Sequence, residues 1–273
     1  MNVTWEEFKA KANAQLDKRQ SYIYRGQANS KWYLSTTIHR TGMLTTQQDF
    51  LDYFEYLMPF VLEPIEAWDG SRRDIKDPNV LAEFLSFLQN NGFPTPLLDW
   101  TFSPYIAAYF AFEAINHFSP QFDKVAIYSF NNLEWVKDYK QSLDWTVKEA
   151  HVSHLTPTYR GNTKQMLQQG TYLFTNQKNV ENHIIKLEKR KGQYLTKYEI
   201  SVKEKAKVFK ELNAMNITAM LLAPSMESVC KKVYEEICAN LQMGLSPSEF
   251  KEVLKNLVNR IENPPTAEED AAG

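Results

Sequence analysis

The chain has few of the residues that mark specialised structural classes. Of its 273 residues, only 2 are cysteine, 9 are glycine and 12 are proline. Collagen-like, linker-like and glycine-rich barrel compositions fit these numbers poorly. The charges also nearly balance, because 33 acidic residues face 31 basic ones and leave a formal net charge of −2. Since 43% of the residues are hydrophobic as well, disorder as the general state is excluded.

The two cysteines are placed too far apart to join. Cys230 and Cys238 lie in one segment that is predicted to be helical, so they are separated by roughly 12 Å along the helix axis. We therefore predict that both are reduced and belong to the core.

Long hydrophobic runs are missing too. The most apolar stretch, residues 105–115, contains Glu113 and is too short to span a bilayer. The N-terminal residues lack the basic and then apolar pattern of a secretory signal. These absences predict a soluble, cytoplasmic protein without a membrane partner.

Aromatic residues, in contrast, are plentiful. Phe, Tyr and Trp make up 13% of the chain, and such large rings supply most of the apolar area that a core can bury. We expect a helix in residues 1–19, a main domain over 20–242, a C-terminal helix over 243–262 and a disordered acidic tail over 263–273. The apolar stripe of the C-terminal helix needs a cover, and we predict that it docks on its own chain rather than on a second copy.

Hydrophobic spacing and capping signals predict a mixed α and β fold. Helices are expected near residues 4–16, 50–62, 80–88, 104–116, 203–213 and 226–241. Strands are expected from residue 22 and over residues 125–130, 171–174, 194–202 and 217–222. Pro64 should limit the second helix, because proline restricts the residue before it.

Two segments hold the least ordinary residue choices. They are YRGQ at residues 24–27 and NGFPTPLLDWTFSP at residues 91–104, which leads into AAYFA at 107–111. Together these motifs resemble the FRG domain family. Weaker agreement at QQGTY, residues 168–172, and at LNAMNI, residues 212–217, extends the resemblance over roughly residues 20 to 240.

The FRG family is similar in turn to the ADP-ribosyltransferase superfamily. That resemblance implies an α+β fold, with a split antiparallel or mixed sheet that cradles NAD, and cleavage of the bond between nicotinamide and ribose. In such folds an Arg or His on the first strand holds the dinucleotide, a later strand heads a helix, and a Glu supports the oxocarbenium-like transition state. Arg25 matches the first role, and residues 99–103 occupy the place of the second.

The third role has no matching carboxylate. Gln169 stands nearest, but a neutral amide cannot stabilise positive charge on a ribose as a carboxylate does. Asp99 is then the candidate anion, so Arg25, Asp99 and Gln169 are the predicted catalytic residues. A second departure is Asn90, at a position where FRG sequences often have His.

The resemblance also implies a set of cofactor-binding residues. They are Tyr24, Arg25, Gly26, Gln27, Thr101, Ser103 and Tyr109. Ordinary structural roles compete with these: an ion pair between Arg25 and Asp99, hydrogen bonds from turn N–H groups to Asp99, and a helix cap at Ser103. We expect Arg25, Asp99, Thr101 and Gln169 to converge on one cleft.

Two other chemistries are disfavoured. His151 and His154 are close enough to suggest paired ligands, but no Cys pair or HExxH pattern accompanies them, so no metal site is expected. Residues 186–210 carry nine Lys or Arg against three Glu. A solvated face explains this basic stretch better than a nucleic acid surface does.

The leading prediction is an ADP-ribosyltransferase-like protein that uses NAD as a substrate and passes ADP-ribose to a protein, a nucleic acid or water. The alternative is a module that binds a nucleotide or ADP-ribose without turnover, which the missing Glu motivates. A third hypothesis is an interaction protein that uses its terminal helices. A monomer is favoured over a homodimer, and the biological context, whether antiviral defence, toxicity or signalling, stays open.

Overall fold

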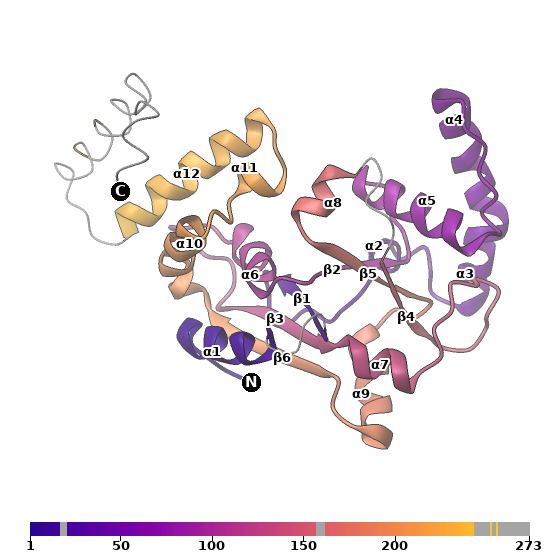
Figure 1. Ribbon diagram of the computed structural model, residues 1–273, viewed down its shortest axis with the longest axis horizontal. Helices are drawn as coiled ribbons and strands as arrows, with labels where there is room; N and C mark the ends of the chain where they lie inside the picture. The colour runs from indigo at the N-terminus through magenta and orange to yellow at the C-terminus, as the bar shows by residue number, and fades with distance from the viewer. Residues whose placement is uncertain (17–20, 157–161, 243–251, 253–254, 256–273) are drawn as a thin grey trace.

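The computed structural model describes residues 1–16, 21–156, 162–242, 252 and 255. At its centre is a six-stranded antiparallel sheet in the order β4-β5-β2-β1-β3-β6, with helices around it (Figure 1). The strands are β1 (Tyr22–Gln27), β2 (Leu97–Thr101), β3 (Lys124–Asn131), β4 (Val152–Leu155), β5 (Gly170–Thr175) and β6 (Leu195–Ser201). The predicted α+β class, with an antiparallel sheet and flanking helices, is confirmed.

The sheet is nearly divided between β1 and β2. These two strands share a single registered pair, Tyr24 with Thr101. On either side the pairing is complete, since β1 pairs with β3 along all six of its residues and β2 pairs with β5 along all five. Two three-stranded halves, β4-β5-β2 and β1-β3-β6, therefore meet at a narrow junction.

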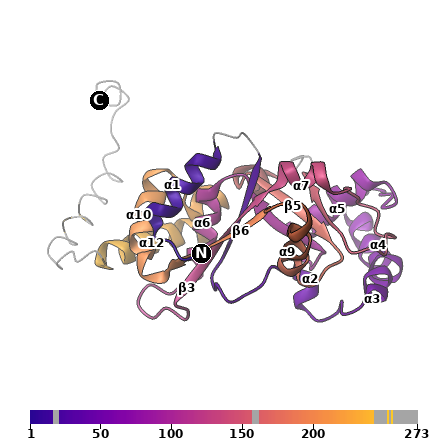
Figure 2. The same cartoon turned by 90° about the horizontal axis from the view of Figure 1, so that it is seen from below.

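Separate sets of helices cover the two halves (Figures 1 and 2). Around β1, β3 and β6 lie α1 (Trp5–Leu16), α6 (Pro104–Glu113), α10 (Lys205–Ala214), α11 (Ala219–Leu222) and α12 (Met226–Gln242). Near β2, β5 and β4 lie α2 (Thr37–Arg40), α3 (Gln47–Asp52), the π-helix η1 (Tyr53–Leu57), α4 (Met58–Asp69), α5 (Pro78–Asn90) and α8 (Thr163–Leu167). The remaining helices are α7 (Asn132–Asp138), α9 (Val180–Lys191) and the 3-10 helix η2 (Val202–Glu204).

Three buried clusters hold these layers together. One joins α1, α6 and α10 to β1, β3 and β6, and includes Trp5 and Phe112. Another joins the helices from α3 to α5 to β5, and includes Phe54 and Phe174. The third runs across both half-sheets from β6 to β5 and includes Trp135 of α7. Because this last cluster crosses the β1–β2 junction, apolar packing holds the halves together where backbone pairing is sparse.

Local signals in the sequence explain the boundaries of the helices that matter most here. At α1, the N–H of Glu7 donates to Thr4 Oγ1 at 3.2 Å and the N–H of Thr4 donates to Glu7 Oε2 at 2.7 Å, which completes the predicted capping box. At α6, Ser103 Oγ accepts from the N–H of Ile106 at 3.3 Å, and Pro104 fills the first turn.

Several sequence predictions are wrong in detail. Pro64 does not end the second helix but lies inside α4, which continues to Asp69. The carbonyl group that it leaves without a helical N–H donor belongs to Phe60, a residue that is exposed to solvent. Residues 217–222 do not form a strand, because Thr218 caps the short helix α11 instead. Of the two cysteines, only Cys238 is buried, whereas Cys230 is exposed.

Some expectations fall outside the described residues. The predicted C-terminal helix over 243–262, apart from residues 252 and 255, and the predicted tail over 263–273 are among these. Within the residues that are described, no helix has the length and apolar character needed to cross a membrane.

Gly26 offers a test of the contact between α6 and β1. A β-carbon on Gly26 would lie 2.0 Å from the Ala107 carbonyl oxygen and 2.5 Å from the Ala111 nitrogen, both backbone atoms that cannot rotate away. Gly26→Ala should therefore lower the free energy of unfolding by about 3 kcal/mol, as overpacking does. Urea denaturation measures this loss.

The matched control is Gly42→Ala. Gly42 has a φ of +81° and no atom within 4 Å of its added β-carbon, so this variant should lose only about 1 kcal/mol through backbone strain. Equal stabilities of the two variants would contradict the packing role of Gly26.

Candidate functional site

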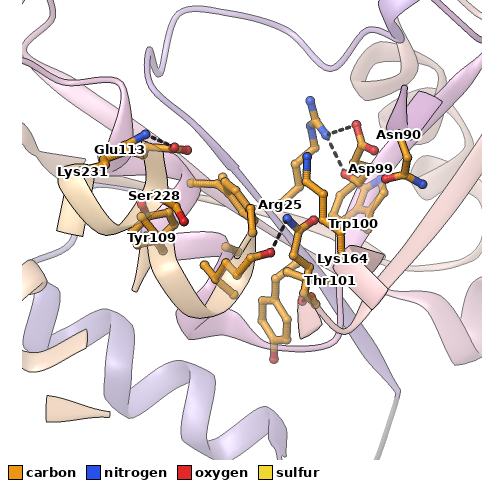
Figure 3. Close-up of a pocket in the computed structure, with 18 of the residues that line it drawn as sticks. Arg25, Asn90, Asp99, Trp100, Thr101, Tyr109, Glu113, Lys164, Ser228 and Lys231 are labelled. Atoms are coloured by element: carbon orange, nitrogen blue, oxygen red, sulfur yellow. Dashed lines mark hydrogen bonds and ion pairs between the residues drawn. The ribbon is translucent and has the colours of Figure 1, made fainter. Parts of the chain in front are cut away.

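A cavity of about 550 Å³ lies against the junction of β1 and β2 (Figure 3). Both edges of the junction contribute, with Tyr24, Arg25 and Gly26 from β1 and Asp99, Trp100 and Thr101 from β2. The remaining walls come from Gln89 and Asn90 of α5, from α6, from Lys164 of α8 with Gln168, and from α11 and the first half of α12. Its size is that of ordinary small-molecule and cofactor sites.

Arg25 spans the junction from β1 to β2. Its Nη1 donates to the Asp99 carbonyl oxygen at 2.6 Å and lies 3.6 Å from Asp99 Oδ2. The side chain is only 16% exposed, and this burial lowers the pKa of the guanidinium, while the charge of Asp99 opposes the shift. Arginine nevertheless keeps its proton in proteins.

One donor of Arg25 is left without a partner. Its Nε is buried and has no hydrogen-bond acceptor among the described residues. Buried N–H groups are usually paired, so the unpaired Nε of Arg25 is an exception in a residue that lines the cavity.

Asp99 is held in place by α5. Gln89 Nε2 donates to Asp99 Oδ2 at 3.0 Å, and Gln89 Oε1 accepts from Thr95 Oγ1 at 2.6 Å, which fixes the orientation of the amide. The Asp99 side chain is still 55% exposed. The carboxylate is therefore oriented by the protein and yet accessible to a molecule in the cavity.

The Thr101 hydroxyl, which was predicted to bind the cofactor, already has hydrogen-bond partners within the protein. Its hydroxyl donates to the Gln168 carbonyl oxygen at 2.7 Å and accepts from the N–H of Ser103 at 3.1 Å. Gln168 in turn donates from Nε2 to the Leu222 carbonyl oxygen at 3.1 Å. This chain of bonds ties β2 to the loop before β5 and to α11, so Thr101 contributes to the shape of the cavity.

The structure brings together six of the predicted site residues and leaves three apart. Those that line the cavity are Tyr24, Arg25, Gly26, Asp99, Thr101 and Tyr109. The others do not line it. Gln27 is buried and donates to the Tyr33 carbonyl oxygen at 3.5 Å, Ser103 caps α6, and Gln169 is exposed with a φ of +48°. The expected convergence on one cleft holds for Arg25, Asp99 and Thr101, whereas Gln168 takes the place expected for Gln169.

Gly26 also has a different role from the one predicted. It lines the cavity, but the atoms that exclude a side chain there belong to Ala107 and Ala111 of α6. Glycine is required because the helix packs closely on the strand.

Charged residues that the sequence motifs did not indicate lie at the far end of the cavity. Figure 3 shows the ion pair between Glu113 of α6 and Lys231 of α12, away from the pair of Arg25 and Asp99. Lys164 is a third cation in the wall. Of the other lining residues, Gln89 and Asn90 directly precede the motif of residues 91–104, and Trp100 lies inside it.

Two buried charged residues, Glu235 and Lys205, lie close to this end of the cavity, where Glu235 bonds to the lining residue Tyr109. Tyr109 Oη donates to Glu235 Oε1 at 3.3 Å, and burial is the main reason that the pKa of Glu235 rises to about 7. Lys205 donates to the Ile115 carbonyl oxygen, and burial lowers its pKa to about 8. Glu235 and Lys205 are both fully packed between α6, α10 and α12.

His154, one of the two histidines considered as metal ligands, is hydrogen-bonded to other side chains. His154 bonds to Asn132 Nδ2 at 3.2 Å through Nδ1 and to Thr171 Oγ1 at 2.8 Å through Nε2. Within the described part of the chain, no group of three or more His, Cys, Asp or Glu is arranged to hold a metal ion.

Comparison with known families identifies one region. Residues 20–119 match the model of the FRG domain. The match includes Arg25, Gln89 and Asp99 but not the later stretches around residues 168–172 and 212–217. No curated protein matches the chain, and no solved structure does.

The raised pKa of Glu235 leads to a prediction about how the stability of the protein depends on pH. Its pKa is about 7 in the folded chain and 4.5 as an ordinary glutamate, so the folded state retains a proton that the unfolded state releases. The contribution of Glu235 to the free energy of unfolding should then fall as pH rises from about 4.5 to about 7, by up to about 1 kcal/mol per pH unit. His39, His117 and His154, whose pKa values burial lowers to about 4, contribute in the opposite direction over this range. Glu235→Gln should remove the contribution of this carboxyl, so stability should rise more steeply with pH in the variant than in the wild type.

Urea denaturation across that pH range checks the prediction. The control is Glu134→Gln, which removes an exposed carboxylate on α7 and should leave the wild-type profile unchanged. A wild-type profile in the Glu235 variant would show that this carboxyl does not hold the proton.

Proposed function

We propose that this FRG-domain chain binds NAD or a related nucleotide in the cavity and cleaves the bond between nicotinamide and ribose, passing ADP-ribose to a macromolecule or to water. One observation carries the proposal: a buried guanidinium with an unpaired Nε lies beside an accessible carboxylate in a cavity of about 550 Å³. The resemblance of FRG domains to the ADP-ribosyltransferase superfamily supplies the reaction class.

Arg25 is proposed to bind the phosphates. A guanidinium binds phosphate oxygens through several N–H groups at once, and the Arg25 side chain lines the cavity with 16% of its surface exposed. Its low exposure strengthens the attraction, because little water screens the charge. Lys164, in the same cavity wall, adds a second cation.

Asp99 is proposed to stabilise the developing cation. As the bond from the ribose carbon to the nicotinamide nitrogen breaks, its electron pair leaves with nicotinamide and positive charge forms on the ribose. A carboxylate oriented by Gln89 can stabilise that charge without reorganising. The acceptor then forms a bond to the ribose carbon and releases a proton to solvent.

A binding module without turnover is the second candidate. Its specific support is that Asp99 Oδ2 lies 3.6 Å from Arg25 Nη1, and an adjacent cation reduces the power of a carboxylate to stabilise another positive charge. Gln168, which lines the cavity in the place expected for Gln169, also has a neutral amide instead of a carboxylate.

The first test uses Arg25→Ala. Losing charge-assisted hydrogen bonds to phosphate should weaken NAD binding about 10- to 100-fold, and titration calorimetry measures this. Arg72→Ala, which removes an exposed Arg that does not line the cavity, is the control and should bind as the wild type does. Equal affinity of both variants would contradict the role of Arg25.

The second test uses Asp99→Asn with release of nicotinamide as the readout. If Asp99 acts on the transition state, the rate should fall by roughly a hundredfold while NAD affinity changes little. The fold should persist, since the side chain is 55% exposed. An unchanged rate would remove Asp99 from the mechanism, and saturable NAD binding without nicotinamide release by the wild type would favour the binding module.

A further inference from the structure

Helix α4 has an apolar surface that the rest of the described chain does not cover. Nine of its twelve residues are apolar, and yet Met58 is the only one that is buried. Exposure reaches 77% at Phe60 and 93% at Trp68. Large aromatic side chains left in water in this way mark a surface that contacts another molecule.

The exposed rings follow one side of the helix. Tyr56, Phe60, Pro64 and Trp68 recur at intervals of four residues, and all four are exposed. Figures 1 and 2 place α4 at the opposite end of the molecule from α12. The surface is therefore separate from the cavity described above.

A groove continues this surface toward α3. Its volume is about 490 Å³, and the apolar side chains that line it are Met43, Leu44, Tyr53, Tyr56, Leu57 and Phe60. The π-helix η1 forms part of the wall, and π-helical turns are frequent at functional sites. The groove and the ring stripe share Tyr56 and Phe60, so they form one continuous surface, which we call the α3–α4 face.

Acidic residues are concentrated in the segment that forms the α3–α4 face. Residues 41–71 contain six Asp or Glu and no Lys, Arg or His. Asp69 pairs with Arg73 at 2.5 Å, and no salt bridge to Lys or Arg joins any of the other five among the described residues. Two of these carboxylates, Asp49 and Asp52, line the groove itself.

We propose that the α3–α4 face binds a cationic amphipathic helix of a partner protein. Helical partners bind apolar grooves through side chains spaced three or four residues apart, and that spacing matches the exposed rings. Lys and Arg on the flanks of the partner helix would meet the carboxylates that have no salt bridge to Lys or Arg. A second copy of this chain fits less well, because two faces of the same negative charge would repel each other.

The test uses a fluorescein-labelled peptide of about 18 residues with Leu on one helical face and Lys on the other, the pattern that helix-in-groove binding requires. Fluorescence anisotropy should show saturable binding to the full chain. Phe60→Ala combined with Trp68→Ala should weaken it at least tenfold, and so should Glu55→Lys combined with Glu63→Lys. Phe118→Ala removes an exposed ring outside this face and should have no effect.

Two further measurements complete the test. A peptide of the same composition, scrambled to lack an apolar face, should bind at least tenfold more weakly than the amphipathic one. Analytical ultracentrifugation should show that the wild type and the aromatic variant, Phe60→Ala with Trp68→Ala, have the same oligomeric state. The proposal is overturned by absence of saturable binding, by equal binding of the two peptides or of all variants, or by a wild-type dimer that the aromatic variant dissociates, which would identify a second copy as the occupant.

Discussion

The narrow junction between β1 and β2 is the constraint on which the rest of the site depends. Because the two strands share one registered pair, backbone groups beyond that pair need other partners. The Asp99 carbonyl oxygen finds one in Arg25 Nη1 at 2.6 Å. The same reach leaves Arg25 Nε buried and unpaired. A break in the ladder thus both opens the cavity and fixes the guanidinium in its wall.

Much of this arrangement follows from local sequence. The capping box at Thr4 and the cap at Ser103 set the starts of α1 and α6, and the motif of residues 91–104 places Asp99 and Thr101 on a strand that leads into a buried helix. Such signals involve residues that are close in sequence, so they can be read without knowledge of the tertiary fold. The nine different residues named for the site came instead from the family resemblance, and six of them line one cavity.

The site predictions that were wrong or missing have a common physical cause: the positions of those residues depend on tertiary contacts. Gln169 and Gln168 differ by one position, and only the left-handed turn at Gln169 determines which of them lines the cavity. The contribution of Glu113 and Lys231 depends on how α12 packs against α6, far along the chain. The role of Gly26 likewise depends on α6, because the Ala107 carbonyl oxygen lies 2.0 Å from where a β-carbon on Gly26 would be.

The pairing of Arg25 with Asp99 bears on whether the proposed site can catalyse. In the free protein the guanidinium lies 3.6 Å from Asp99 Oδ2 and partly neutralises it. A pyrophosphate bound to Arg25 would bring negative charge to the guanidinium and offset that neutralisation, because opposite charges in a poorly hydrated site interact strongly. Gln89 would still hold the carboxylate in place through its 3.0 Å hydrogen bond. Ligand binding itself would then make Asp99 a better partner for a cationic ribose, so the ion pair of the free site is compatible with catalysis.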